Sequence, residues 1–223
     1  MWVGSQVYAT DAGLIGYGAS YGSRKDQASI KFGGFELALV ENPGAGSYDT
    51  LIPKLEARYD LALGDHNIAF AGGYNTLDDN TLDETVDSIF YGIGYTGAFG
   101  PVWINAAFHG GQNLTNAAWY GSGTNAATPG GKDTDTMAVA FAVGMAASET
   151  LQFQGGLGYL AEENDDIGPE TDEVMSYYVQ MTYAFAPGFV VIPEIGVVDN
   201  MKDMNDNKQG STTYVGAKWQ INF

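Results

Sequence analysis

The stretch KLEARYDLAL at residues 54–63 decides the fold. Charged and apolar side chains alternate along it without interruption from residue 54 to residue 61. Side chains alternate between the two faces of a β-strand, whereas a helix would scatter these residues around its circumference. The stretch therefore predicts a strand with an apolar face, formed by Leu55, Ala57, Tyr59, Leu61 and Leu63, and a charged face, formed by Lys54, Glu56, Arg58 and Asp60.

The same two-residue period recurs along the chain, most clearly in residues 175–185 and 213–223. We interpret the sequence as about twelve such segments. Their ranges are 2–9, 12–22, 28–41, 52–63, 67–75, 86–97, 101–111, 136–146, 150–160, 174–185, 189–199 and 212–223. Within 28–41 the apolar positions change parity at Gly33-Gly34, which predicts a β-bulge there.

The connections between these segments alternate in length. Short ones lie near 64–66, 99–101, 148–150 and 186–188, and long polar ones near 42–51, 76–85, 112–135, 161–173 and 200–211. Outer-membrane barrels show this rhythm because the two ends of their meander face different environments. The expected fold class is all-β, an antiparallel up-and-down transmembrane β-barrel that forms a single domain over residues 1–223.

The composition excludes several other classes of protein. The chain has 223 residues, no cysteine, 31 glycines and a net charge of −18. Without cysteine there is no disulfide scaffold, thiolate zinc site or cysteine nucleophile. The acidic balance argues against a nucleic-acid partner, and no stretch approaches the roughly 18 apolar residues of a membrane-spanning helix.

A soluble β-sandwich would also show alternating strands, so alternation alone does not distinguish it from the barrel. Three features favour the barrel. The segment 136–146 is apolar or small on both faces, and the chain stops on Phe223 at the end of an alternating strand. Aromatic residues also lie near the segment ends, as in the aromatic girdles of membrane barrels. They are Tyr59, Tyr95, Tyr159, Tyr183, Trp219 and Phe223.

At its C-terminal strand, TYVGAKWQINF, the sequence resembles the porins of Gram-negative outer membranes. In that family a terminal aromatic residue, with apolar residues at alternate earlier positions, is the signal that the barrel assembly machinery reads. Trp219, Ile221 and Phe223 match this pattern, whereas Gly216 lies further from the end than the family's glycine. The resemblance implies an outer-membrane location, contact with lipid and lipopolysaccharide, and a homotrimer.

The resemblance also bears on how much of a barrel the chain supplies. General porins have sixteen strands and longer chains, so this chain is expected to be either a C-terminal portion of such a barrel or a twelve-stranded barrel of its own. Residues 1–4 lack the basic and apolar regions of a signal peptide. We therefore expect either that a signal peptide has been removed or that the chain starts within a longer protein.

The face opposite the lipid is expected to line a water-filled channel for small hydrophilic solutes and ions. A dry core could not hold its many charges and amides without dense pairing. The expected pore-lining residues are Lys31, Glu36, Lys54, Glu56, Arg58, Asp60, Asn105, His109, Gln152, Gln154, Gln180, Glu194, Lys218 and Gln220. The alternating positive and negative side chains at 54–60 would orient dipolar solutes in the channel. The alternative is a network of ion pairs that has only a structural role in the wall.

The longest connection, 112–135, carries Trp119 and Tyr120, which would be unusual on a solvated loop tip. It could fold into the lumen as a constriction, against the small residues of 136–146 and the glycines at 156 and 158. The alternative is a loop that packs on a neighbouring subunit or on its own barrel.

Acidic residues gather in the long loops and predict a preference for cations, because a negative entrance attracts them. Glu162, Glu163, Asp165 and Asp166 could also hold loop-bound Ca²⁺ or Mg²⁺, although a solvated acidic loop is the favoured interpretation and no other cofactor is expected. We expect no enzymatic activity. The alternatives are a barrel enzyme of the phospholipase or protease type, in which His109 could act as a base, and a plugged structural or adhesive barrel.

Overall fold

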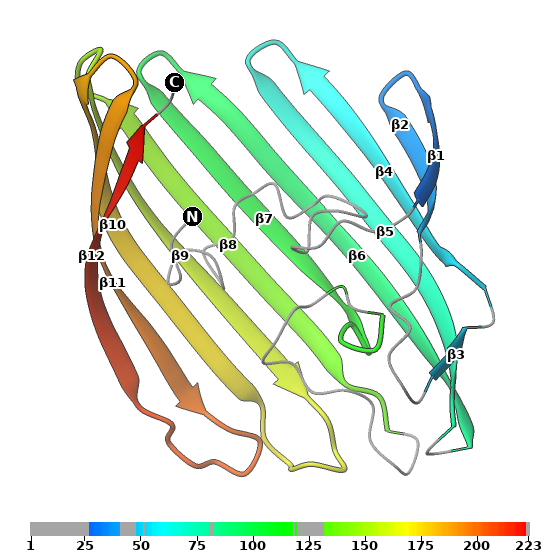
Figure 1. The fold of residues 1–223 in the computed structure, drawn as a ribbon. Coiled ribbons are helices and arrows are strands. Elements are labelled where there is room, and N and C mark those ends of the chain that lie inside the picture. Colours follow the sequence, from blue (N-terminus) through cyan, green and yellow to red (C-terminus); the bar gives the residue numbers. More distant parts are fainter. Residues whose placement is uncertain are drawn as a thin grey trace.

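The computed structural model describes residues 27–40, 48–50, 52–80, 83–117, 119 and 132–221. Within these residues it contains twelve β-strands and no helix. The strands are β1 (Gln27–Phe32), β2 (Phe35–Val40), β3 (Tyr48–Thr50), β4 (Lys54–Leu63), β5 (His66–Asp79), β6 (Glu84–Phe99), β7 (Val102–Gln112), β8 (Asp135–Ala146), β9 (Leu151–Glu163), β10 (Asp172–Ala186), β11 (Phe189–Lys202) and β12 (Ser211–Ile221) (Figure 1). The predicted all-β class is confirmed.

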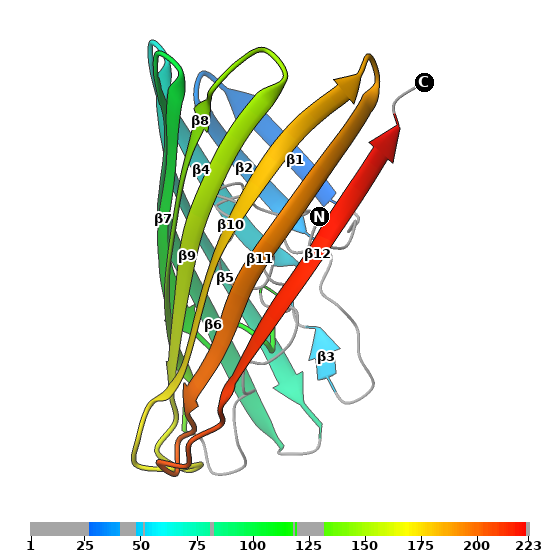
Figure 2. The same ribbon diagram turned by 90° about the vertical axis from the view of Figure 1, so that its left-hand side faces the viewer.

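All strands belong to one antiparallel sheet, and from β4 to β12 each strand pairs with the next one along the chain. The short strand β3 lies off this path and pairs with β5. The edges β1 and β12 are not paired with each other, so the described strands form a strongly curved open sheet (Figures 1 and 2). The predicted up-and-down topology is confirmed. The twelve described strands do not close into a barrel on their own.

The predicted segments from residue 52 onward agree with β4–β12 to within four residues at each end. Segments 2–9 and 12–22 lie outside the described residues. Segment 28–41 is not one bulged strand but the hairpin β1–β2, with Phe32 opposite Phe35 and Gly33 in the left-handed region at φ 59°. A two-residue turn shifts the parity of the apolar positions just as a bulge does, and only the reversal of direction separates the two.

Short turns lie at one end of the sheet and longer connections at the other (Figure 1). The loop expected at 76–85 is shorter than predicted, because β5 and β6 continue to Asp79 and Glu84 and remain paired there. The loop expected at 42–51 contains β3, which pairs with residues 77–79 of β5. The sheet therefore extends further at the loop end than the polarity of those residues suggested.

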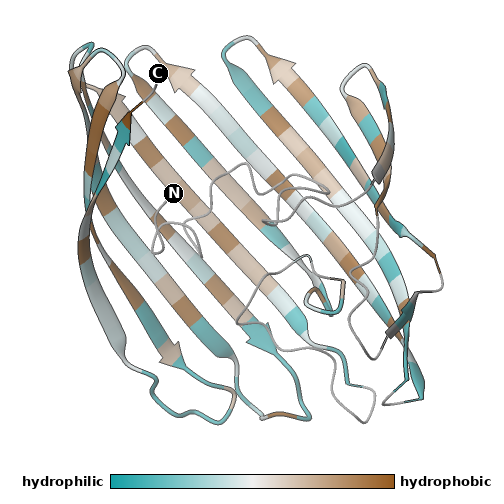
Figure 3. Ribbon diagram, in the orientation of Figure 1, coloured by the Kyte–Doolittle hydropathy of each residue, from teal (hydrophilic) through white to brown (hydrophobic). Residues whose placement is uncertain are grey.

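The two faces of the sheet are reversed relative to a soluble protein, in which large apolar side chains are buried and charged ones exposed. On β4, Leu55 is 41% exposed, whereas its neighbours Lys54 and Glu56 are 1% and 2% exposed. Apolar and polar residues form alternating bands along the strands (Figure 3). Exposed apolar side chains continue along the outer face through Ile195 and Val215, so that face is suited to a non-aqueous environment.

Aromatic side chains mark both ends of the apolar outer face. At the short-turn end, the rings of Phe185 and Trp219 each lie 5.8 Å from the ring of Phe189. Towards the loop end, Tyr74 is exposed on the same face and its hydroxyl donates to Asp87. A strand of about eleven residues tilted by about 45° spans roughly 25 Å, which matches the apolar band of a bilayer barrel. Among the described residues there is no helix long and apolar enough to cross a membrane.

Candidate functional site

The candidate site is the inner, concave face of the sheet. The strand register places all the expected pore-lining residues on this one face, since directly opposed residues share a face. On β1, β2 and β4, Lys31 lies opposite Glu36, which lies opposite Arg58. On β9, β10 and β11, further along the same face, Gln154 lies opposite Gln180, which lies opposite Glu194. The alternation of the sequence therefore separates the two faces as the strands require.

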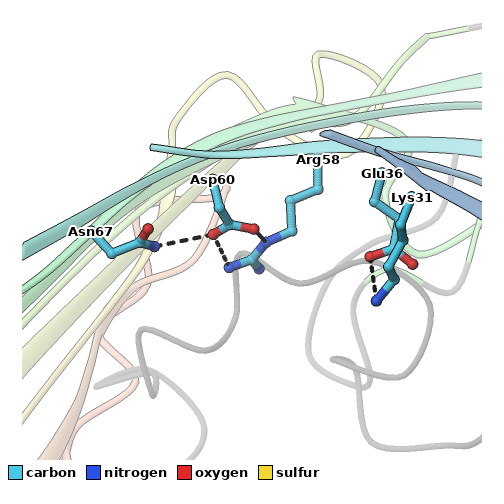
Figure 4. Close-up of polar contacts among 5 residues, drawn as sticks. All are labelled: Lys31, Glu36, Arg58, Asp60 and Asn67. Carbon is cyan, nitrogen blue, oxygen red and sulfur yellow. Dashed lines mark hydrogen bonds and ion pairs between the residues drawn. The ribbon is translucent and has the colours of Figure 1, made fainter. Parts of the chain in front are cut away.

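The inner face of β1, β2 and β4 is a surface of paired charges. Lys31 Nζ lies 2.7 Å from Glu36 Oε2. Arg58 donates from Nε and Nη2 to the two carboxylate oxygens of Asp60, at 2.6 and 2.7 Å. Asn67 Nδ2 adds a third hydrogen bond to Asp60, at 3.0 Å (Figure 4). The two-pronged contact fixes the guanidinium in the plane of the carboxylate, so this row presents alternating charges in defined positions.

The loop after β7 is held to the inner face by Asn113. Its side-chain Nδ2 donates to the backbone oxygen of Asp87 and to Oδ1 of Asp133, at 2.9 and 2.6 Å. Its Oδ1 accepts the backbone N–H of Thr134, and its own backbone oxygen accepts the hydroxyl of Ser88. Asn113 thus connects the start and the end of the long connection to the wall of β6.

Trp119 continues this segment and is buried, with 1% of its surface exposed. Its Nε1 donates to Oε1 of Glu56 at 2.8 Å, and its ring lies 5.8 Å from that of Phe90. Lys54 Nζ lies 5.7 Å from the centre of the indole ring and donates to the backbone oxygen of Ala117 at 2.9 Å. The segment therefore lies on the concave side of the sheet, with its apolar atoms against Phe90 and its polar atoms on the charged row.

The sequence suggested that this connection packs on the small residues of 136–146 and the glycines at 156 and 158. Among the described residues of the connection, Leu114, Ala117 and Trp119 cluster instead with Phe90 of β6, and Leu114 also lies against Gly111 of β7. The reason is local: Gly73 on β5 has no side chain, and a Cβ there would lie 2.6 Å from Cζ2 of Trp119. The indole occupies this space beside its carboxylate acceptor. Tyr120 lies outside the described residues.

A second set of hydrogen-bonded polar side chains lies on β9–β12. Gln180 Nε2 donates to Gln154 Oε1 at 2.8 Å, and Gln154 Nε2 donates to the hydroxyl of Tyr178. On the neighbouring strands, the hydroxyl of Tyr214 donates to Glu194 Oε1 at 2.8 Å. The sequence prediction omitted both tyrosines, although Tyr178 has the parity of Gln180 and Tyr214 that of Lys218.

The remaining predicted residues are divided between the inner and the outer face of the sheet. His109 is 2% exposed, with its ring 6.2 Å from that of Phe90. Trp219 and Ile221 of the expected assembly signal are 66% and 59% exposed on the outer face, whereas Phe223 lies outside the described residues. Asn105, Gln152, Lys218 and Gln220 occupy inner-face register positions on β7, β9 and β12.

The four acidic residues proposed for a divalent cation do not come together. Glu162 and Glu163 are consecutive in β9 and so face opposite sides; Glu162 accepts the hydroxyl of Thr136 at 3.2 Å. Asp165 lies 3.6 Å from Lys132. Across the described ranges, no three His, Asp or Glu side chains are grouped as metal ligands would be.

The loop between β11 and β12 is organised by one carboxylate. Asp203 accepts hydrogen bonds from the backbone N–H groups of Asn205 and Asn207 and from the side chains of Asn207 and Gln209. These hydrogen bonds, those from Asn207 first, lower the pKa of Asp203 below its ordinary value. The acidic loop therefore has a defined turn of its own.

No family model matches this chain, and no curated protein matches it either. Solved structures do match. DcaP, an outer membrane channel of Acinetobacter baumannii, superposes with a TM-score of 0.68 at 12% identity, over 87% of this chain and 62% of that one. The chain has the fold of the outer-membrane channels.

Two further structures agree with this fold. OmpT, an outer membrane protein of Vibrio cholerae in a trimer form, matches with a TM-score of 0.61 at 14% identity, over 96% of this chain and 68% of that one. The anion-selective porin from Comamonas acidovorans matches with a TM-score of 0.56 at 11% identity, over 87% of this chain and 55% of that one. The chain thus spans less than two thirds of DcaP and of this porin, and its open sheet shares the curvature and topology of the porin fold.

Proposed function

We propose that this protein is a porin of a Gram-negative outer membrane, with a water-filled channel for passive diffusion of small hydrophilic solutes and ions. One observation carries the proposal: Leu55 is 41% exposed on the outer face, while Lys54 and Glu56 on either side of it point inward. An apolar outer face favours lipid. On the inner face Lys54 and Glu56 are covered by the Trp119 segment, while Arg58 and Asp60 further along the same strand remain partly exposed, and this arrangement supports a wall between lipid and an aqueous lumen.

The channel prefers cations, and the preference comes from its mouth rather than from its wall. The charges predicted on the inner face are Lys31, Lys54, Arg58 and Lys218 against Glu36, Glu56, Asp60 and Glu194, so they cancel. The net charge of −18 therefore arises elsewhere, with many acids near the long connections, among them Glu170 and Asp206. The field of exposed charges decays over about 10 Å at 0.1 M salt, so the preference weakens as salt rises.

The segment that carries Trp119 narrows the lumen as a constriction. Its contacts with Glu56 and Phe90 support this role, because they hold bulky groups on the inner side of the wall. The shared fold does not by itself imply a preference for cations, since the porin from Comamonas acidovorans is anion-selective. Selectivity in this chain follows from its own charges at the constriction and the mouth.

The proposed partners follow from the two surfaces. The apolar outer face contacts lipid, and the acidic loops share divalent cations such as Ca²⁺ or Mg²⁺ with the phosphates of lipopolysaccharide. A homotrimer is supported by the trimer form of the Vibrio cholerae neighbour. The terminal strand, with Trp219 and Ile221 exposed on its outer side, serves as the recognition signal for the barrel assembly machinery.

The test is single-channel recording on the full-length protein in planar bilayers, with the reversal potential measured across a KCl gradient. The proposal predicts steady conductance with a cation-selective potential that declines at high salt. Absence of conductance would favour the plugged structural barrel, and an anion-selective potential would contradict the selectivity. Replacement of His109 by Ala separates a channel from a barrel enzyme, because solute flux should persist in this variant while a histidine-dependent hydrolysis would be lost.

A further inference from the structure

We infer that the inner wall at the short-turn end carries a binding site for neutral sugar rings, centred on Trp103. The inference rests on the proposed channel function, because it names a class of solute that the lumen would hold. It draws on three features of the wall: an open hollow beside Trp103, an indole ring that lies against the wall, and polar side chains around the hollow that are available to a ligand.

The hollow has a volume of about 380 Å³ and lies where β6 and β7 meet the turn between β4 and β5. The strand register places its side chains on the inner face, with Thr96 opposite Asn105 and Ala98 opposite Trp103. Asp65 completes the hollow from the turn, where its backbone oxygen accepts the N–H of Ala98 at 3.1 Å. A hollow of this size can hold one small solute. Its lining consists of Asp65, Thr96, Gly97, Ala98, Trp103 and Asn105.

The indole ring of Trp103 lies over Gly144, which is its opposed residue on β8. A Cβ at Gly144 would collide with Cε2 and Cζ2 of the indole, so the ring occupies the place that a side chain would take there. Trp103 is nevertheless only partly buried. The ring is therefore supported by the wall on one side, and part of it stays accessible to a solute in the hollow.

The polar groups around the hollow are available to a ligand. Asp65 and Thr96 are exposed, and Asn105 is partly exposed. Throughout the described ranges, no side-chain hydrogen bond or ion pair engages any of these three residues. Asn67, which lies opposite Thr96, already donates to Asp60 (Figure 4). The hollow thus borders the charged row of β4 and adds a carboxylate, a hydroxyl and a carboxamide of its own.

These groups select a neutral sugar ring over a charged solute. A pyranose carries C–H groups on the faces of its ring, which can pack on the indole. Its hydroxyl groups lie around the edge and need both donors and acceptors, which a carboxylate, a hydroxyl and a carboxamide supply together. Asp65 is the one charged side chain among the six lining residues, so anions are repelled. Because Asp65 is exposed, an ammonium group would gain little from pairing with it.

The experiment is saturation-transfer difference NMR on the full-length protein with methyl β-D-glucopyranoside. The protein is kept in dodecylphosphocholine micelles, because this detergent carries no sugar. Methyl β-D-glucuronide and butylammonium chloride serve as the anionic and the cationic probe. The proposal predicts saturation transfer to the glucoside, with a dissociation constant lower than that of either charged probe.

The first set of variants tests the platform. Trp103→Ala removes the ring and should weaken binding of the glucoside by about tenfold, whereas Trp103→Phe keeps an aromatic ring and should lose less. Phe141→Ala removes an exposed ring from the outer face of β8 and is the matched control, which should bind like the parent. Asp65→Asn removes the negative charge of the lining and should bind the glucuronide more tightly than the parent does.

A further variant keeps the test decisive if Trp103→Ala does not fold. Thr96→Val exchanges an exposed hydroxyl for a methyl group, leaves the indole in place and should weaken binding of the glucoside by about threefold. The site is overturned if the parent shows no saturation transfer to the glucoside. Parent-like binding in Trp103→Ala or Thr96→Val, or tighter binding of butylammonium than of the glucoside, overturns it as well.

Single-channel conductance, recorded separately, distinguishes failure of the site from failure of the channel. Conductance without binding of the glucoside overturns the site alone. Binding that depends on Trp103 in a protein that never conducts overturns the channel and leaves the site in place.

Discussion

The indole Nε1 of Trp119 donates a 2.8 Å hydrogen bond to Oε1 of Glu56, a residue 63 positions earlier in the chain. This contact ties the segment after β7 to the charged wall of β4. It places an apolar ring and a fixed charge pair on the concave side of a sheet whose convex side is exposed and apolar. The constriction proposed for the channel depends on it.

Replacement of Trp119 by Phe tests the energy of this contact. Phe keeps the ring against Phe90 but cannot donate to Glu56, so we expect the free energy of unfolding to fall by about 2 kcal/mol. Denaturant unfolding in detergent micelles measures the change. The control is Trp219→Phe on the exposed outer face, for which a loss below about 0.5 kcal/mol is expected. Equal losses in the two variants would contradict the assigned role of the Glu56 contact.

Two consecutive glycines on β5 provide a sharper comparison. A Cβ at Gly73 would lie 2.6 Å from Trp119, whereas a Cβ at Gly72 would meet only the backbone oxygen of Phe90, at 3.5 Å. Gly73→Ala should therefore displace the indole and cost about 1–3 kcal/mol of stability, while Gly72→Ala should be close to neutral. Thermal unfolding of both variants, followed by tryptophan fluorescence, measures the difference. Similar melting curves for the two would show that the indole does not depend on this space.

The fold itself could be predicted from the sequence because strand faces follow a two-residue period. The alternation at 54–61 is enough to assign Leu55 outward and Glu56 inward, and the same rule places β4–β12. The hairpin at Gly33-Gly34 could not be told from a bulge, because both change the parity of the apolar positions and the sequence carries no direct signal of chain direction.

The contacts within the candidate site could not be predicted from the two-residue period. Nothing in the local sequence of Trp119 points to Glu56, since the pairing depends on how β5 and β6 place Gly73 and Phe90 beneath the ring. Tyr178 and Tyr214 had the correct parity, but their roles depend on glycines of neighbouring strands, which only the register brings opposite them. Long-range packing of this kind is set by the tertiary fold rather than by periodicity.

The pair Arg58–Asp60 gives a test of the wall's electrostatics. Asp60→Asn leaves the guanidinium without its carboxylate, so the wall gains a net positive charge and the reversal potential should shift towards anions. The double variant Arg58→Gln, Asp60→Asn is neutral again and should return close to the parent value. Bilayer recordings in a KCl gradient measure both. An unchanged potential in Asp60→Asn would mean that these residues do not face the ion path.

The turn at Asp203 predicts a local pH effect. Hydrogen bonds, with those from Asn207 foremost, stabilise the ionised carboxylate and lower its pKa below the ordinary 3.8. A lowered pKa in the folded state means that the turn is stabilised above this value and loses that stabilisation as the pH falls through the lowered pKa. Amide hydrogen exchange at Asn205 and Asn207 should therefore accelerate only below about pH 4. Asp203→Asn should show fast exchange already at neutral pH, and slow exchange there would argue against the carboxylate as the organiser.

The central claim is that one face of each strand meets lipid and the other meets water. Because the chain has no cysteine, single cysteines can be introduced and spin-labelled without background. Labels at 57, 59, 217 and 219 should collide with oxygen dissolved in the bilayer, and labels at 58, 60, 218 and 220 with a water-soluble nickel complex. This two-residue alternation, measured by electron paramagnetic resonance in lipid vesicles, is the result we predict. The opposite phase, or equal access to both reagents along each strand, would contradict the account.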